Sequence, residues 1–163
     1  MSDERPNLYL LRAADIAARS QTYAHPWNPQ SSMTGYAMAK ATGLKRTGVN
    51  LARLPPGKES FLYHSHWLEE EWIYIIEGRA MAHIDGAQYE VGPGDFMAFP
   101  APGVAHHLRN PFDEELVYLM GGESREFDVI DCPEVDKRMF RHAKGMEVFD
   151  LSGSQPFGPL QEK

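Results

Sequence analysis

Cysteine is almost absent from this sequence, and long hydrophobic runs are absent altogether. The 163 residues contain one cysteine, Cys132, which excludes an internal disulfide and is typical of a reducing compartment. The charged start, Met1 to Arg5, leads into no apolar segment, so we expect neither a signal peptide nor a membrane span. These absences predict a cytoplasmic protein without a membrane partner.

Clusters of positive charge are also missing. Lys and Arg number 16 against 23 Asp and Glu, which gives a formal net charge of −7, and no basic run alternates with aromatic residues. Nucleic acid is therefore not expected as a partner. A small-molecule substrate, even an anionic one, is compatible with this charge, because a pocket needs only one or two local cations and a bound metal ion is itself positive.

The residues that are present predict one compact, mainly β domain. A hydrophobic content of 42% suits a single core, and short β-rich segments alternate with turns that contain Gly and Pro. One short helix is expected within residues 8–20. Strands are expected at residues 47–54, 71–76, 79–84, 88–91, 96–99, 104–110 and 115–120. Many short strands at regular intervals are typical of a sandwich or barrel.

Two histidines in the middle of the chain are the strongest chemical signal. His64 and His66 are two residues apart, so a strand would point both to one face, whereas a helix would not. Such a pair by itself is more often a surface or hydrogen-bonded pair than a ligand pair. Glu71 follows with an oxygen ligand, and His106 offers a third imidazole on another expected strand. The three histidines and the carboxylate together favour a metal site.

The stretches around these residues resemble the two motifs of the cupin superfamily. The first motif, G-x5-H-x-H-x3-4-E-x6-G, is matched by His64, His66, Glu71 and Gly78, with Gly57 one residue too far away. The second, G-x5-P-x-G-x2-H-x3-N, is matched with one extra residue before its second glycine, by Gly94, Pro100, Gly103, His106 and Asn110. Both departures fall in expected turns, where an insertion is tolerated.

The resemblance implies a fold, a division of the chain and an assembly. The implied fold is all-β, a double-stranded β-helix barrel of jelly-roll type with a short N-terminal helix and a C-terminal arm. In this division residues 1–45 form the N-terminal arm, residues 46–121 the barrel, and residues 122–163 a C-terminal extension that packs on the barrel. Relatives of this size pair through strand edges and arms, so a homodimer is expected.

The resemblance also implies that one divalent metal ion is bound by His64, His66, Glu71 and His106. Mixed nitrogen and oxygen ligation suits Zn, Mn, Fe, Ni or Cu, and the sequence does not choose among them. Cys132 lies far from both motifs in the sequence, so no thiolate ligand is expected. Strand alternation points His107 away from His106, outward or toward a partner. Glu69 and Glu70 are expected to be solvated.

The reaction is left open by the motifs, because related barrels carry unrelated chemistry. The favoured hypothesis is a metal-dependent enzyme acting on a small polar metabolite, a sugar-phosphate isomerase working through a metal-stabilised enediolate. The alternatives are an Fe(II)-type dioxygenase or decarboxylase, and a non-catalytic protein that binds a metabolite. The general base is unassigned, with His25, Tyr63 and a metal-bound hydroxide all open. The expected pocket residues are Tyr63, Trp67, Phe99 and Arg53, the last as a phosphate ligand.

Overall fold

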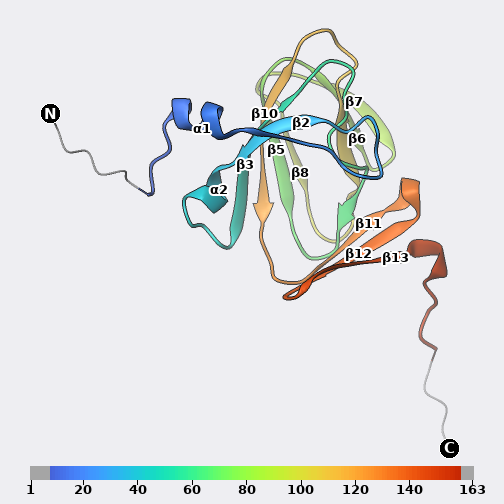
Figure 1. Cartoon of the computed structure of the whole chain (residues 1–163). Coiled ribbons are helices and arrows are strands. Elements are labelled where there is room, and N and C mark those ends of the chain that lie inside the picture. The colour runs from blue at the N-terminus through green and yellow to red at the C-terminus, as the bar shows by residue number, and fades with distance from the viewer. Residues whose placement is uncertain (1–7, 159–163) are drawn as a thin grey trace, which may run out of the picture.

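The computed structural model describes residues 8–158 (Figure 1). The charged start, Met1 to Arg5, and the final residues of the expected C-terminal arm, 159–163, lie outside the described residues. The expected N-terminal helix is confirmed in its second half, as α1 (Ala13–Arg19), and a single further turn forms α2 (Met38–Ala41). Between residues 8 and 158, no helix combines the length and hydropathy needed to cross a bilayer.

Two antiparallel sheets form the barrel. The larger sheet has the strand order β1-β2-β3-β10-β5-β8, and the smaller has the order β7-β6-β9. The strands of the larger sheet are β1 (Gln21–Tyr23), β2 (Met33–Ala37), β3 (Thr47–Leu54), β5 (Glu71–Glu77), β8 (Phe96–Phe99) and β10 (Leu116–Glu123). Those of the smaller sheet are β6 (Ala80–Ile84), β7 (Ala87–Val91) and β9 (His106–Arg109). All seven expected strands are present, within a few residues of their expected bounds.

Alternation along the strands decides which side chains form the core. On β5, Ile73 and Ile75 are buried while Tyr74 is exposed, as the sequence predicts. Glu71, two residues before Ile73, therefore begins the strand on its inner face. The apolar interior is completed by residues from the other barrel strands, which include Ala52, Leu54, Ala80, Ala82, Val91, Met97, Phe99, Leu108, Leu116 and Tyr118.

A third sheet, formed largely by the C-terminal extension, was not predicted as strands. Its order is β13-β12-β11-β4, with bounds β4 (Ser65–His66), β11 (Asp128–Cys132), β12 (Lys137–His142) and β13 (Gly145–Asp150). Two single-turn 3₁₀ helices, Pro133–Val135 and Leu151–Gly153, flank β12 and β13. In Figure 1 this sheet, orange to red, lies against one end of the barrel. Because β11 pairs with β4, the extension is bonded directly to the strand that carries His66.

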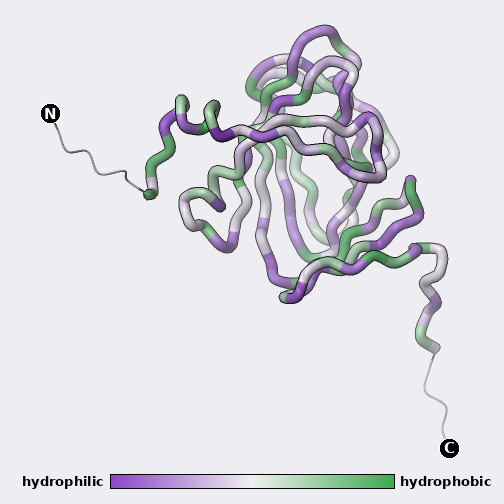
Figure 2. The backbone as a smooth tube through the Cα atoms, in the orientation of Figure 1, coloured by the Kyte–Doolittle hydropathy of each residue, from purple (hydrophilic) through white to green (hydrophobic). Residues whose placement is uncertain are grey.

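Hydrophobic side chains also hold the extension to the barrel. Ile130 and Cys132 of β11 are buried against Leu62 in a small second core, and Trp27 of the N-terminal arm packs against this cluster. Figure 2 shows hydrophobic segments on the C-terminal strands as well as in the barrel. The extension and the N-terminal arm thus meet over the segment that leads into His64.

Two turn glycines provide a test of how closely the barrel strands are packed. Gly78 and Gly86 both have positive φ, at 75° and 80°. A Cβ at Gly78 would lie 2.3 Å from the carbonyl oxygen of Glu115, whereas a Cβ at Gly86 would meet nothing within 4 Å. We expect Gly86→Ala to lower the free energy of unfolding by about 1–2 kcal/mol, the cost of a left-handed backbone. Gly78→Ala should lower it by about 3 kcal/mol or more, because backbone must also shift.

Urea denaturation of the two variants and the parent protein measures both effects. Gly86→Ala is the matched control, since it shares the backbone strain and lacks the steric contact. Equal losses for the two variants would contradict the close approach of the turn at Gly78 to the start of β10.

Candidate metal centre

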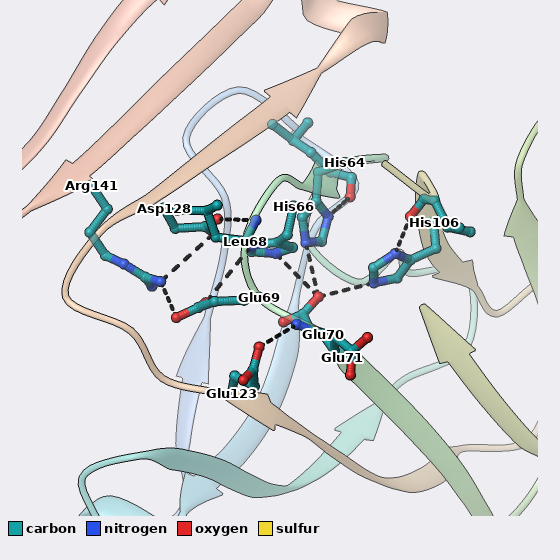
Figure 3. A network of polar contacts seen from close by, with 12 residues as sticks. His64, His66, Leu68, Glu69, Glu70, Glu71, His106, Glu123, Asp128 and Arg141 are labelled. Carbon is teal, nitrogen blue, oxygen red and sulfur yellow. Dashed lines mark hydrogen bonds and ion pairs between the residues drawn. The ribbon is translucent and has the colours of Figure 1, made fainter. Parts of the chain in front are cut away.

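Three separate pieces of backbone bring the predicted ligands together. His64 forms an isolated antiparallel bridge with His106, in which each backbone N–H donates to the carbonyl of the other, at 3.2 and 2.8 Å. His66 lies on β4 and Glu71 begins β5. Figure 3 shows the carboxylate of Glu71 directed at all three imidazole rings. The residues that the sequence predicted as a ligand set are therefore neighbours in space.

Three of the four side chains, His64, His66 and Glu71, have ligand atoms within 4.8 Å of one another, and His106 joins them through its contact with Glu71. Glu71 Oε2 lies 3.6 Å from His64 Nε2, 3.2 Å from His66 Nε2 and 3.2 Å from His106 Nε2. The His64 ring is 5.0 Å from the His66 ring and 4.9 Å from the His106 ring, measured between centroids. Three imidazole nitrogens and one carboxylate oxygen are a donor set that suits a divalent transition metal.

Hydrogen bonds on the far side of each ring fix which nitrogen faces this point. His64 Nδ1 lies 2.8 Å from the carbonyl oxygen of Leu62, and His106 Nδ1 lies 3.0 Å from that of Val104. Because a carbonyl oxygen only accepts, each Nδ1 carries the proton, and the Nε2 of the neutral ring presents its lone pair to Glu71. This is the tautomer in which Nε2 binds a metal.

The arrangement fits a cation better than it fits an empty site. Two imidazole lone pairs and a carboxylate oxygen face one another, which is repulsive unless a positive charge lies among them. His66 Nε2 is moreover a buried polar atom without a hydrogen bond, since its contact with Glu71 lacks hydrogen-bond geometry. Buried polar atoms without partners are rare in proteins and mark places where an ion or water belongs.

The charged groups of the site raise the pKa of His66 and lower the pKa of Glu71, which favours a positive charge beside an ionised carboxylate. Burial by itself lowers the pKa of His66, but Asp128 and Glu71 together raise it to about 9. Burial by itself raises the pKa of Glu71, but the contacts with His106, His64 and His66 lower it well below its ordinary value. Without a metal ion, a proton on His66 supplies the positive charge that the cluster needs.

A second group of charged residues surrounds the outer side of His66, and the motifs gave no sign of it. His66 Nδ1 lies 2.5 Å from Asp128 Oδ2, and the other Asp128 oxygen accepts the backbone N–H of Leu68 at 3.1 Å. Glu69, expected to be solvated, is instead 4% exposed and forms an ion pair with Arg141. That prediction was wrong because the extension, which carries Arg141 and Asp128, covers this side of the barrel (Figure 3).

Three adjoining cavities lie around the candidate centre, and Phe61 lines all of them. His64 and Glu71 line the central and C-terminal cavities, whereas none of the four ligand candidates lines the N-terminal one. The central cavity, about 130 Å³, is bounded by His64, Glu71 and His106. The N-terminal cavity, about 220 Å³, runs toward Tyr23 and shares Met120 and Asn50 with the central one. The C-terminal cavity, about 190 Å³, is lined by His25, Phe61, Leu62, His64, His66, Glu71, Ile130, Cys132 and Met139.

The expected pocket residues take other places. Phe99 is buried and stacks on the His106 ring, 3.5 Å between centroids and 3° from parallel, so it supports a ligand. Tyr63 accepts the Gly86 N–H at 2.8 Å, and Trp67 is 46% exposed and donates to Asp131. Arg53 pairs with Glu115 at 2.8 Å on the outer surface. None of these four residues is among those that line the three cavities, and their pocket role stays a prediction.

Two further expectations need correction. His107 does point away from His106, but it is 4% exposed instead of outward in solvent, because its ring packs against Tyr63 and His83. Cys132 is remote in sequence, yet it lines the C-terminal cavity beside two of the histidines. Burial and the nearby Asp131 raise the pKa of its thiol to about 11, so it is protonated at neutral pH. The absence of a thiolate ligand stays a prediction, and distance from the site no longer supports it, because Cys132 lines a cavity together with His64, His66 and Glu71.

Comparisons with known proteins agree with this description. The family model described as "Cupin domain" matches residues 50–122. A crystal structure named as a candidate sugar phosphate isomerase from Acidithiobacillus ferrooxidans is 32% identical, with a TM-score of 0.88, covering 93% of this chain and 98% of that one. A cupin-superfamily sugar phosphate isomerase from Silicibacter pomeroyi is 25% identical, with a TM-score of 0.75, covering 86% and 94%.

A further relative is similar to this chain over a shorter segment. An uncharacterised protein of Methanocaldococcus jannaschii is 37% identical over 59 residues, which are 36% of this chain and 46% of that protein. This chain therefore matches somewhat less than half the length of that relative.

Adjacent histidines on opposite faces of β9 test the site. We expect His106→Ala to abolish stoichiometric binding of Zn(II) or Mn(II), because it removes a nitrogen that faces Glu71. His107→Ala should leave metal binding intact and lower the free energy of unfolding by about 1–3 kcal/mol through lost packing. Metal content after dialysis and urea denaturation measure the two effects. Equal loss of metal in both variants would show that the faces are wrongly assigned.

Proposed function

The chain belongs to the cupin superfamily, and from this premise we propose that it is a metal-dependent enzyme acting on a small polar metabolite. The observation that carries the proposal is the convergence of three imidazole Nε2 atoms on Glu71 Oε2. His64, His66, Glu71 and His106 are the proposed ligands. A divalent ion held by them would act as a Lewis acid on the oxygens of a substrate. The adjoining cavities give such a substrate access to the centre.

An isomerase reaction is the proposed chemistry. Two structures similar to this chain over most of its length are named as sugar phosphate isomerases, one of them as a candidate. In such a reaction a proton leaves the carbon beside a carbonyl group and returns to the neighbouring carbon, so no oxidant or second substrate is consumed. The chain must then bind a hydroxycarbonyl compound, orient it at the ligands and exclude water.

His25 is proposed to contact the substrate. It lines the C-terminal cavity together with His64, His66 and Glu71. Its Nδ1 accepts the backbone N–H of Trp27 at 3.3 Å, so the neutral ring carries its proton on Nε2. Burial, followed by the proximity of His64, lowers the pKa of His25, which keeps the ring neutral at physiological pH. In this state Nε2–H can donate to a substrate oxygen. Tyr63, the other candidate side chain for proton transfer, lines none of the three cavities.

The cavity walls favour an uncharged substrate over a phosphorylated one. No Lys or Arg is present among the residues that line the three cavities. A phosphate group needs cationic or backbone N–H donors, and a charged group in an apolar wall is costly. We therefore propose a neutral hydroxycarbonyl compound as the substrate, in place of the sugar phosphate that the sequence favoured.

The expected homodimer stays a prediction that sedimentation can test.

Anaerobic assay of the metal-loaded protein tests the proposed reaction. We expect interconversion of an aldose and a ketose from a panel of neutral sugars, unchanged when oxygen is removed, with solvent deuterium incorporated next to the carbonyl. Phosphorylated members of the panel should be turned over no faster than their neutral counterparts. Turnover that requires and consumes oxygen would move the protein to the dioxygenase class. Metal binding without turnover of any compound would favour a binding protein.

His25→Ala tests the proposed substrate contact. We expect turnover to fall about 10²-fold, because a donor to the reacting oxygen is lost, with the metal content unchanged. His142→Ala is the matched control, since His142 contacts Glu147 on the C-terminal hairpin, at 3.5 Å, and lines none of the three cavities. Full activity of His25→Ala would remove this residue from the proposed site.

A further inference from the structure

The three histidines of the candidate metal centre are not equivalent, because their outer nitrogens have different partners. The Nδ1–H groups of His64 and His106 donate to backbone carbonyls, which are neutral. His66 Nδ1–H instead faces a carboxylate, Asp128 Oδ2, at 2.5 Å. A carboxylate partner makes the ring more electron-rich and its Nε2 a stronger donor to a metal. His66 is thus the ring that the surrounding protein prepares most strongly for a cation.

Asp128 is held in place as an anion. Its side chain is 0% exposed, one oxygen accepts the Leu68 N–H, and Arg141 Nη2 lies 3.8 Å from the other. A buried carboxylate needs such partners to remain charged. Three groups from two distant segments of the chain, residues 66–68 and Arg141, therefore fix both the charge and the direction of this side chain.

The balance of charge around His66 matches a divalent ion. Glu69, Asp128 and His66 form a second cluster in which a cation could be held, but the guanidinium of Arg141 already pairs with Glu69 there. When the imidazoles are neutral, the formal charge of the cluster is −2. It is the sum of three carboxylates, on Glu69, Glu71 and Asp128, and one guanidinium, on Arg141. A divalent cation between the Nε2 atoms neutralises this charge. Charge balance of this kind strengthens binding where water is excluded.

We propose that Asp128 is a positioning residue for the metal: it fixes the Nδ1–H tautomer of His66 and strengthens its Nε2 as a ligand. This inference rests on the proposed metal site. With this role for Asp128, the C-terminal extension contributes to the metal centre, because Asp128 is the first residue of β11. This strand lies outside residues 50–122, which match the family model. The same strand pairs with β4 through Ile130 and His66, so backbone and side chain locate His66 together.

The affinity for Zn(II), measured by competition with a chelator, tests the proposal. We expect Asp128→Asn, which keeps the size and removes the charge, to weaken binding about 10–100-fold. The matched control is Asp131→Asn on the same strand, because Asp131 bonds Arg138 at 2.6 Å and Trp67 at 3.0 Å, away from the ligands. The control should bind Zn(II) as the parent does, although it also loses a charged pair. Urea denaturation establishes that both variants are folded.

The outcomes distinguish a failure of the proposed metal site from a failure of the proposed role of Asp128. A parent protein that binds no Zn(II) would overturn the proposed metal site itself. Tight binding by the parent and equally tight binding by Asp128→Asn would overturn only the role of Asp128. If Asp128→Asn does not fold, the proposal is tested on the parent protein instead. ¹⁵N-histidine spectra of its Zn(II) form should show His66 protonated at Nδ1 and bound to the metal through Nε2. The reverse tautomer would contradict the proposal.

Discussion

The contact of Glu71 Oε2 with three imidazole Nε2 atoms is the constraint on which the centre of this protein depends. Negative charge and lone pairs lie close together at one partly buried point, and only a proton or a metal ion makes this arrangement favourable. The barrel keeps them together because the His64–His106 bridge and the start of β5 are fixed by backbone hydrogen bonds. Close packing contributes as well: a Cβ at Gly122, opposite Glu71, would lie 2.4 Å from the Glu70 carbonyl oxygen.

Support for the ligands comes from two different sources. The barrel orients His64 and His106 through neutral backbone carbonyls and packs Phe99 against the second ring. The C-terminal extension orients His66 through a charged group and covers that charge with Arg141 and Glu69. A scaffold shared with many cupins thus provides the geometry, while the extension adjusts the electrostatics of one ligand.

The cavities show a comparable division between barrel and extension. Barrel residues such as Asn50 and Tyr118 bound the central cavity, whereas Ile130, Cys132 and Met139 bound the C-terminal one. The N-terminal arm adds His25 to the C-terminal cavity, where its ring is proposed to donate a hydrogen bond to the substrate. Under the proposed function, a substrate would therefore contact segments outside the two motifs as well as residues within the first motif, such as Phe61.

The sequence by itself determined most strands of the barrel and, through the resemblance to the two motifs, the ligand candidates, because both are local patterns. The two-residue spacing of His64 and His66 and the alternation of Glu71 with Ile73 follow from strand geometry alone, as does the opposition of His106 and His107. Only the tertiary structure decided what surrounds them. Asp128 is 62 residues from His66 along the chain, so no spacing rule relates them, and β11 must pair with β4 before they meet. Burial of Glu69 and His107, and the position of Cys132 at the cavity, likewise depend on which segment covers which strand, a property of long-range packing that no local pattern encodes.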